Sequence, residues 1–91
     1  MGGVVLFQIK LMPEGTEVNL VSLGEFAKET VKDLGATNVK IDEQPIAFGL
    51  KALIVGFRIS EDVDSSKIEE SLANLDGVSS VQIMDYRRAI N

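Results

Sequence analysis

Carboxylates are the most abundant side chains in this chain that could take part in chemistry. The 91 residues include 14 Asp and Glu against 9 Lys and Arg, with neither Cys nor His. A chain without Cys and His has no thiol nucleophile, no disulfide, no imidazole base and no zinc-finger pattern. The commonest soft-metal ligands are absent as well, so we expect no metal site. The acids are scattered over expected helix surfaces and loops, as is typical of solvated faces: Glu25, Glu29, Asp33, Glu61, Asp62, Asp64, Glu69 and Glu70.

Two short motifs suggest phosphate binding, but neither is specific. Gly56-Phe57-Arg58 resembles a stretch of the small acylphosphatases, in which an Arg holds phosphate. Here Phe57 falls on the inner face of an expected strand and Arg58 on its outer face, as in any amphipathic strand. The segment MPEGT has one Gly and no following Lys, so it is not a phosphate loop. The net charge of −5 argues against a nonspecific nucleic-acid binder but leaves room for a local basic patch.

The stretch EQPIAFGLKAL, residues 43–53, places apolar side chains where the backbone is expected to turn. Pro45 stiffens the entry to this turn, and Gly49 allows a positive φ. Phe48 is then expected at or near the tip of the loop that joins two strands. Two interpretations stay open: Phe48 anchors a partner protein in a pocket, or it folds back over the sheet edge as part of the chain's own core.

Hydrophobic spacing predicts the elements that position these residues. Alternating apolar residues predict strands over 4–11, 37–42, 52–59 and 78–86. Apolar residues at spacings of three and four predict a helix from about Asn19 to about Leu34. A capping box of Ser66 and Glu69 is expected to begin a second, short helix that stops at Gly77.

This order of elements predicts an α+β fold of the ferredoxin-like βαββαβ type. We expect a two-layer sandwich in which a four-stranded antiparallel sheet carries both helices on one face. The first and third strands are expected to be central and parallel neighbours. Residues 1–91 are expected to form a single domain. No run approaches the roughly 20 apolar residues of a membrane span, so we expect a cytoplasmic protein without a membrane partner.

The sheet face that the helices leave open is the second candidate for a binding surface. It is expected to carry four of the nine basic residues and only one acid, next to a small apolar patch. That combination suits a partner with negative charge, although two-layer folds always expose some apolar residues there. A small-ligand-binding or RNA-binding domain is therefore an alternative, with Tyr86 as the only aromatic available for stacking on this face. The expected open-face residues are Val4, Leu6, Gln8, Lys10, Asn38, Lys40, Asp42, Ala52, Ile54, Gly56, Arg58, Gln82, Met84, Tyr86 and Arg88.

The turn and the two chain ends together resemble the archaeal elongation factor 1-beta family. The resemblance rests on EQPIAFGLKAL, on the final DGVSSVQIMDYRR and on the initial VVLFQIKLMPEG, and it covers essentially the whole chain. PIAFGLKAL is similar to the Pro-Ile-Gly-Phe-Gly-Ile-Lys stretch of the eukaryotic relatives, with Ala47 in place of a Gly.

The resemblance implies a guanine-nucleotide exchange factor that promotes GDP release and GTP reloading on the elongation factor 1-alpha GTPase. Such a factor performs no bond chemistry of its own, so the resemblance also implies a protein that is not an enzyme, with no catalytic residue and no cofactor. The expected partner is that GTPase in its GDP-bound or nucleotide-free state, with no direct nucleic-acid contact. The Phe of the family's loop contacts the GTPase, and it corresponds to Phe48. Eukaryotic members also carry a Lys near the C-terminus that reaches the Mg²⁺ and phosphate region, where this chain has Asn91 instead. Two interpretations stay open: Arg87 or Arg88 supplies a cation near the same place, or the two form a surface pair without that role. The expected partner-binding residues are Pro45, Ile46, Phe48, Gly49, Lys51, Arg87 and Arg88.

Overall fold

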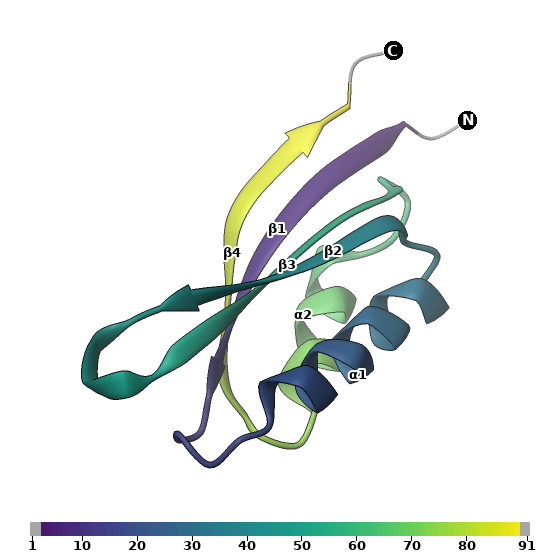
Figure 1. Ribbon diagram of the computed structural model, residues 1–91. Helices are drawn as coiled ribbons and strands as arrows, with labels where there is room; N and C mark the ends of the chain where they lie inside the picture. Colours follow the sequence, from purple (N-terminus) through teal and green to yellow (C-terminus); the bar gives the residue numbers. More distant parts are fainter. Residues whose placement is uncertain (1–2, 90–91) are drawn as a thin grey trace.

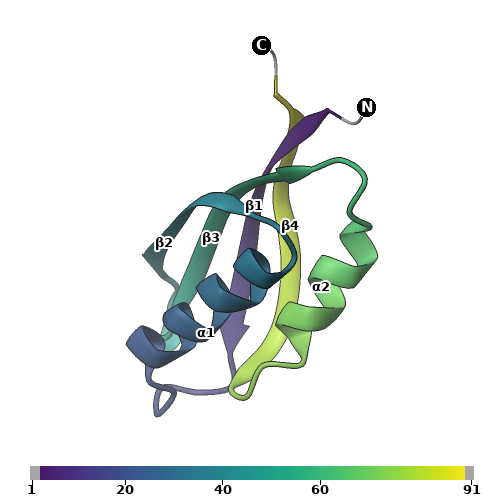
Figure 2. The ribbon, with the colours of Figure 1, turned by 90° about the vertical axis from the view of Figure 1, so that its right-hand side faces the viewer.

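The computed structural model describes residues 3–89, which form a four-stranded sheet with two helices on one face (Figures 1 and 2). The strand order is β2-β3-β1-β4, so the expected ferredoxin-like α+β fold is confirmed. Within residues 3–89, no helix is long and apolar enough to cross a membrane. The elements are β1 (Val4–Pro13), α1 (Leu20–Asp33), β2 (Thr37–Pro45), a 3₁₀ turn (Ala47–Gly49), β3 (Lys51–Ser60), α2 (Ser65–Ala73) and β4 (Val78–Arg88).

The first and third strands are central, as predicted, but the prediction that they run parallel is wrong. β1 and β3 pair antiparallel, with Phe7 opposite Phe57. The reason lies in the connections on either side of β2. The crossover through α1 brings β2 back parallel to β1, and the tight hairpin after β2 then reverses the chain. β3 must therefore run against β1 when it pairs with it.

The core lies between the sheet and the two helices. Alternate residues of β1 and β3 point inward, and their side chains are almost completely removed from solvent. The inner stripe of α1 and two residues of α2, Ile68 and Leu72, complete the layer. The fully buried large side chains are Val5, Ile9, Leu11, Val31, Leu53, Val55, Ile68 and Leu72.

Side-chain caps set where both helices begin. Asn19 Oδ1 accepts hydrogen bonds from the backbone N–H groups of Val21 (3.0 Å) and Ser22 (3.1 Å), so α1 begins where the sequence placed it. The expected capping box of Ser66 and Glu69 is wrong. The N-cap of α2 is Asp64, whose carboxylate accepts from the Ser66 N–H at 2.9 Å.

A β-bulge in β4 changes which residues reach the open face. Phe7 pairs with Tyr86 and Ile9 pairs with Ile83, so Met84 is an extra residue in β4. The bulge reverses the inward-outward alternation beyond it. The prediction that Tyr86 and Arg88 lie on the open face is therefore wrong, and Asp85 and Arg87 lie there instead. Tyr86 packs edge-on against Phe7, with ring centroids 4.9 Å apart.

Candidate partner-binding surface

The loop between β2 and β3 presents Phe48 to solvent. This side chain is 95% exposed, so the interpretation that Phe48 covers the chain's own core does not hold. The Ile46 N–H donates to the Leu50 carbonyl (2.9 Å) and the Leu50 N–H donates to the Ala47 carbonyl (3.3 Å), which closes the loop. The tip is thus a defined turn that displays a phenylalanine.

The backbone at this tip is left-handed at two successive residues. Phe48 has φ 62° and ψ 32°, and Gly49 has φ 73°. The positive φ expected at Gly49 is therefore confirmed, and glycine adopts it without a Cβ penalty. Phe48 has no such freedom, because its Cβ crowds the carbonyl oxygen in this conformation at a cost of roughly 1–2 kcal/mol. A strained residue that contributes nothing to the core is a feature that clusters at functional sites.

Replacing Phe48 by glycine is expected to stabilise the isolated protein by about 1 kcal/mol, because the left-handed strain is relieved. Phe48→Ala is expected to leave the free energy of unfolding within about 0.5 kcal/mol of the wild type. Urea unfolding followed by circular dichroism measures both changes. A loss of about 3 kcal/mol or more in either variant, as for a buried Phe, would contradict the exposed position of this side chain.

The other expected loop residues surround the tip. Pro45 pairs with Lys51 at the last rung of the hairpin, and both are exposed. Ile46 is half-buried, so only part of its side chain is available for contact with a partner. The Lys51 ammonium lies 3.6 Å from a Glu43 carboxylate oxygen, in an exposed ion pair that contributes little to stability.

The two arginines at the end of β4 are both held by carboxylates. Arg87 Nε lies 2.9 Å from Asp85 Oδ2. Arg88 Nε donates to Glu61 Oε2 at 3.0 Å. Sequence reasoning missed both acids. The signal for Asp85 was that unbroken alternation from Val81 and Ile83 would bury this charged residue, whereas Glu61 lies 27 positions before its partner and nothing local marks that pair. Asn91, the other expected residue at this end, lies outside the described residues.

Glu61 joins three segments of the chain. Its Oε1 accepts the Gly3 N–H at 3.0 Å, its Oε2 accepts from Arg88, and its own N–H donates to the Gly3 carbonyl at 2.9 Å. The hydrogen bond from the Gly3 N–H lowers the pKa of Glu61 below its ordinary value, and the hydrogen bond from the Arg88 guanidinium lowers it further. The same hydrogen bond to Glu61 raises the pKa of Arg88. The corner after β3 therefore fixes the start of β1 and the end of β4.

Glu61→Gln is expected to flatten the loss of stability in acid. A carboxyl group with a lowered folded-state pKa stabilises the fold above its unfolded-state pKa of about 4.3. That contribution disappears as the pH falls through the folded-state value. Below about pH 4.3, the free energy of unfolding of the wild type should thus fall more steeply than that of Glu61→Gln. Urea unfolding at a series of pH values measures this, with exposed Glu70→Gln as the control. If the free energy of unfolding falls with pH in the same way below about pH 4.3 for all three proteins, the role of Glu61 is contradicted.

The expected partner-binding residues form two groups at opposite ends of the sheet (Figure 1). The loop group precedes the first residue of β3, while the arginines lie beside the start of β1, which pairs with the last residue of β3. The ten residues of β3 correspond to about 30 Å. The molecule is elongated, 44 Å along its longest axis. A partner that contacts both groups must therefore extend along the whole sheet.

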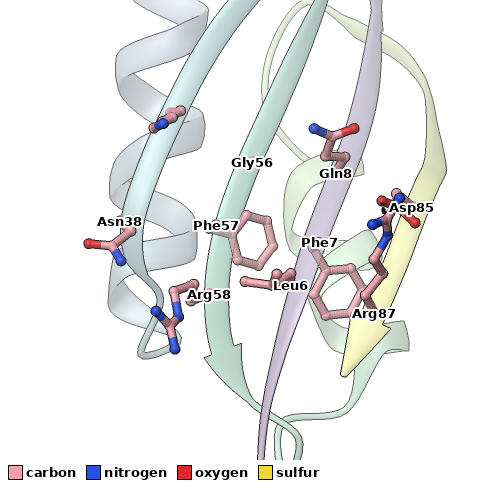
Figure 3. Close-up of a pocket in the computed structure, with 10 residues that line it drawn as sticks. Leu6, Phe7, Gln8, Asn38, Gly56, Phe57, Arg58, Asp85 and Arg87 are labelled. Carbon is pink, nitrogen blue, oxygen red and sulfur yellow. Dashed lines mark ion pairs between the residues drawn. The ribbon is translucent and has the colours of Figure 1, made fainter. Parts of the chain in front are cut away.

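A shallow hollow of about 460 Å³ lies on the open face, in the half of the sheet nearer the arginines (Figure 3). Side chains from all four strands surround it, and three of them are cations (Lys40, Arg58, Arg87) against one carboxylate (Asp85). Because the bulge turns Tyr86 to the helix side, this face offers no aromatic ring for base stacking within residues 3–89. The same part of the chain contains no group of three or more acidic, His or Cys side chains that could hold a metal ion.

The family model and the curated relatives agree on one family. Residues 6–89 match the family described as the EF-1 guanine nucleotide exchange domain. The chain is 40% identical to elongation factor 1-beta of Methanothermobacter thermautotrophicus over 94% of this chain and 97% of that protein. It is 36% identical to elongation factor 1-beta of Sulfolobus acidocaldarius over 92% of this chain and 94% of that protein. A solved Bacillus cereus protein, named for the antibiotic biosynthesis monooxygenases, shares only the fold. Its TM-score is 0.50 at 18% identity, with 100% of this chain and 96% of that chain covered.

Proposed function

This chain belongs to the EF-1 guanine nucleotide exchange domain family, and we propose that it promotes GDP release and GTP reloading on elongation factor 1-alpha. The single feature of the site that carries the proposal is Phe48. A 95% exposed aromatic in a closed, strained turn contributes little to its own fold, and such side chains are the usual anchors of protein interfaces.

The proposed partner is the GTPase in its GDP-bound or nucleotide-free state. The whole chain, residues 1–91, acts as one exchange domain in this proposal, and the cytoplasm is its compartment because its relatives are named as elongation factors. The contacts come from Pro45, Ile46, Phe48, Gly49 and Lys51 at one end of the sheet. Arg87 and Arg88 supply them at the other end.

Exchange of this kind requires no bond chemistry in the factor. The factor and the nucleotide need only weaken each other's binding to the GTPase, and the coupling is the same in both directions. A coupling free energy of about 4 kcal/mol accelerates GDP release roughly a thousandfold when all of it appears in the off-rate. Contacts at two ends of a rigid sheet suit this task, because they fix the factor's orientation against the GTPase.

Stopped-flow release of a fluorescent GDP analogue tests the proposal. An archaeal elongation factor 1-alpha is loaded with the analogue and mixed with excess unlabelled GDP, with and without this protein. We expect release to accelerate by two to three orders of magnitude and to saturate with protein concentration, which corresponds to roughly 3–4 kcal/mol of coupling. An unchanged release rate at saturating concentration would refute the proposed function.

A further inference from the structure

We propose that the hollow on the open sheet face, which includes Gly56, is a docking site that receives a carboxylate-bearing segment of the GTPase. The inference rests on the proposed function and extends the arginine group, with which the hollow shares Arg87, along the open face toward the middle of the sheet. Its floor is formed by β1 and β3, and its walls come from the edge strands β2 and β4 (Figure 3).

The fold itself does not require the glycine that lines this hollow. Gly56 lies in the middle of β3, where a glycine weakens a strand and often marks a place that another molecule approaches closely. A Cβ built at Gly56 would meet nothing nearer than the Phe7 carbonyl oxygen at 3.8 Å, an ordinary contact. Its φ is also not among the positive values of the chain. Because Gly56 has no side chain, the sheet surface at this position is open to an approaching molecule.

Two bulges arrange polar groups around Gly56. Gln8 and Lys40 are its cross-strand neighbours on the open face, from β1 and β2. The bulge at the start of β2 holds Asn38 at φ 53°, a left-handed value for a residue that lines the hollow. The bulge in β4 turns Asp85 and Arg87 toward the same side. Irregular edge strands on both sides of one site are typical of binding surfaces.

The charge of the hollow is opposite to that of the chain. Among its lining residues, Arg87 is already paired with Asp85, while Lys40 and Arg58 take part in no ion pair within residues 3–89. These two cations belong to a chain with a net charge of −5. They therefore form a local positive patch whose complement is an acidic group. Arg58 offers a planar fork that matches a carboxylate.

A protein segment fits this patch better than a nucleic acid does. RNA recognition on such a sheet uses aromatic side chains for stacking, and the described part of this face has none. The overall negative charge also opposes the approach of a long polyanion. A GTPase that contacts Phe48 at one end and the arginines at the other can lie across the hollow, which would enlarge the interface along the sheet.

The test compares two hollow variants with a matched control in binding to the GTPase. Lys40→Gln/Arg58→Gln removes both unpaired cations, and Gly56→Val fills the floor with a residue that favours strands. Lys28→Gln/Lys32→Gln removes two exposed cations from α1 instead. The Kd for nucleotide-free GTPase is measured by calorimetry at 50 and 200 mM salt, together with GDP release. Thermal unfolding confirms that each variant folds.

Both hollow variants are expected to raise the Kd roughly tenfold or more, while the α1 control changes it less than about twofold. The double variant should also show a weaker salt dependence than the wild type. If the wild type accelerates GDP release but neither hollow variant changes the Kd, the inference alone is overturned. If the wild type itself fails to accelerate release, the proposed function and the occupant assigned here are both wrong. Binding of a short single-stranded RNA that Lys40→Gln/Arg58→Gln abolishes would also overturn the assignment of a protein occupant.

Discussion

Phe48→Ala is expected to reduce the acceleration of GDP release by about 30-fold or more at sub-saturating concentrations of the factor. Truncating an interface anchor typically costs 2 kcal/mol or more, which corresponds to that factor in affinity. The side chain is 95% exposed in the free protein, so the variant keeps its fold and the loss can be read as lost contact. Stopped-flow release over a range of factor concentrations separates a raised half-saturation concentration from a lowered maximal rate.

Phe26→Ala is the matched control for this experiment. Phe26 is also exposed, at 59%, but it lies on α1 on the helix side of the sheet. Its removal should change the release rate by less than about twofold, as for a surface substitution outside an interface. Equal effects of Phe26→Ala and Phe48→Ala would show that the hairpin tip has no special role. A Phe48→Ala variant as active as the wild type would remove the tip from the interface.

The fold could be predicted because its signals are local and repeat along the chain. Val5, Phe7, Ile9 and Leu11 alternate strictly, so they identify a strand and its buried face without knowledge of its neighbours. Asn19 is similarly a local signal, because a cap acts on N–H groups two and three residues further on. Strand direction depends on connections. The crossover through α1 and the tight hairpin after β2 require β1 and β3 to pair antiparallel, so the expectation of parallel neighbours conflicted with the antiparallel sheet that the same order of elements predicts.

The open face was harder to predict, because a β-bulge shifts the alternation within one strand. Strict alternation from Val81 and Ile83 would place the charged Asp85 and Arg87 on the buried face, and this conflict is the one local sign of the extra residue Met84. One bulge exchanged Tyr86 and Arg88 for Asp85 and Arg87 on that face. The ion pairs of the two arginines depend on the same register.

The separation of the site into two ends also lies beyond sequence patterns. PIAFGLK is continuous in the chain, so its residues were bound to lie together at one turn. The arginines come nearly 40 positions later, and only the sheet register places them at the far end of β3. An interface that reaches both ends uses the rigidity of the long strands, since the distance between the contacts is fixed by the backbone ladder and not by flexible loops.

The carboxylates beside Arg87 and Arg88 bear on how these side chains would act at a nucleotide site. A guanidinium already paired with a carboxylate must exchange that partner for a phosphate or for a carboxylate that binds Mg²⁺. The exposed pairs here are weak, so the exchange costs little. In the free protein Asp85 and Glu61 pair with the guanidinium groups, and the proposed function requires that these pairs open when the GTPase binds.

Arg87→Ala/Arg88→Ala is accordingly expected to lower the maximal rate of GDP release by about 10- to 100-fold, since hydrogen bonds to charged groups contribute roughly 1.5–3 kcal/mol. If the arginines compete with Mg²⁺, raising Mg²⁺ should slow release by the wild-type factor while barely affecting the variant. Stopped-flow release from 0.1 to about 10 mM Mg²⁺ measures both, and Arg87→Lys/Arg88→Lys should restore only part of the rate because an ammonium cannot make a bidentate contact. A variant with the wild-type maximal rate and the wild-type response to Mg²⁺ would place the source of the cation elsewhere in the chain.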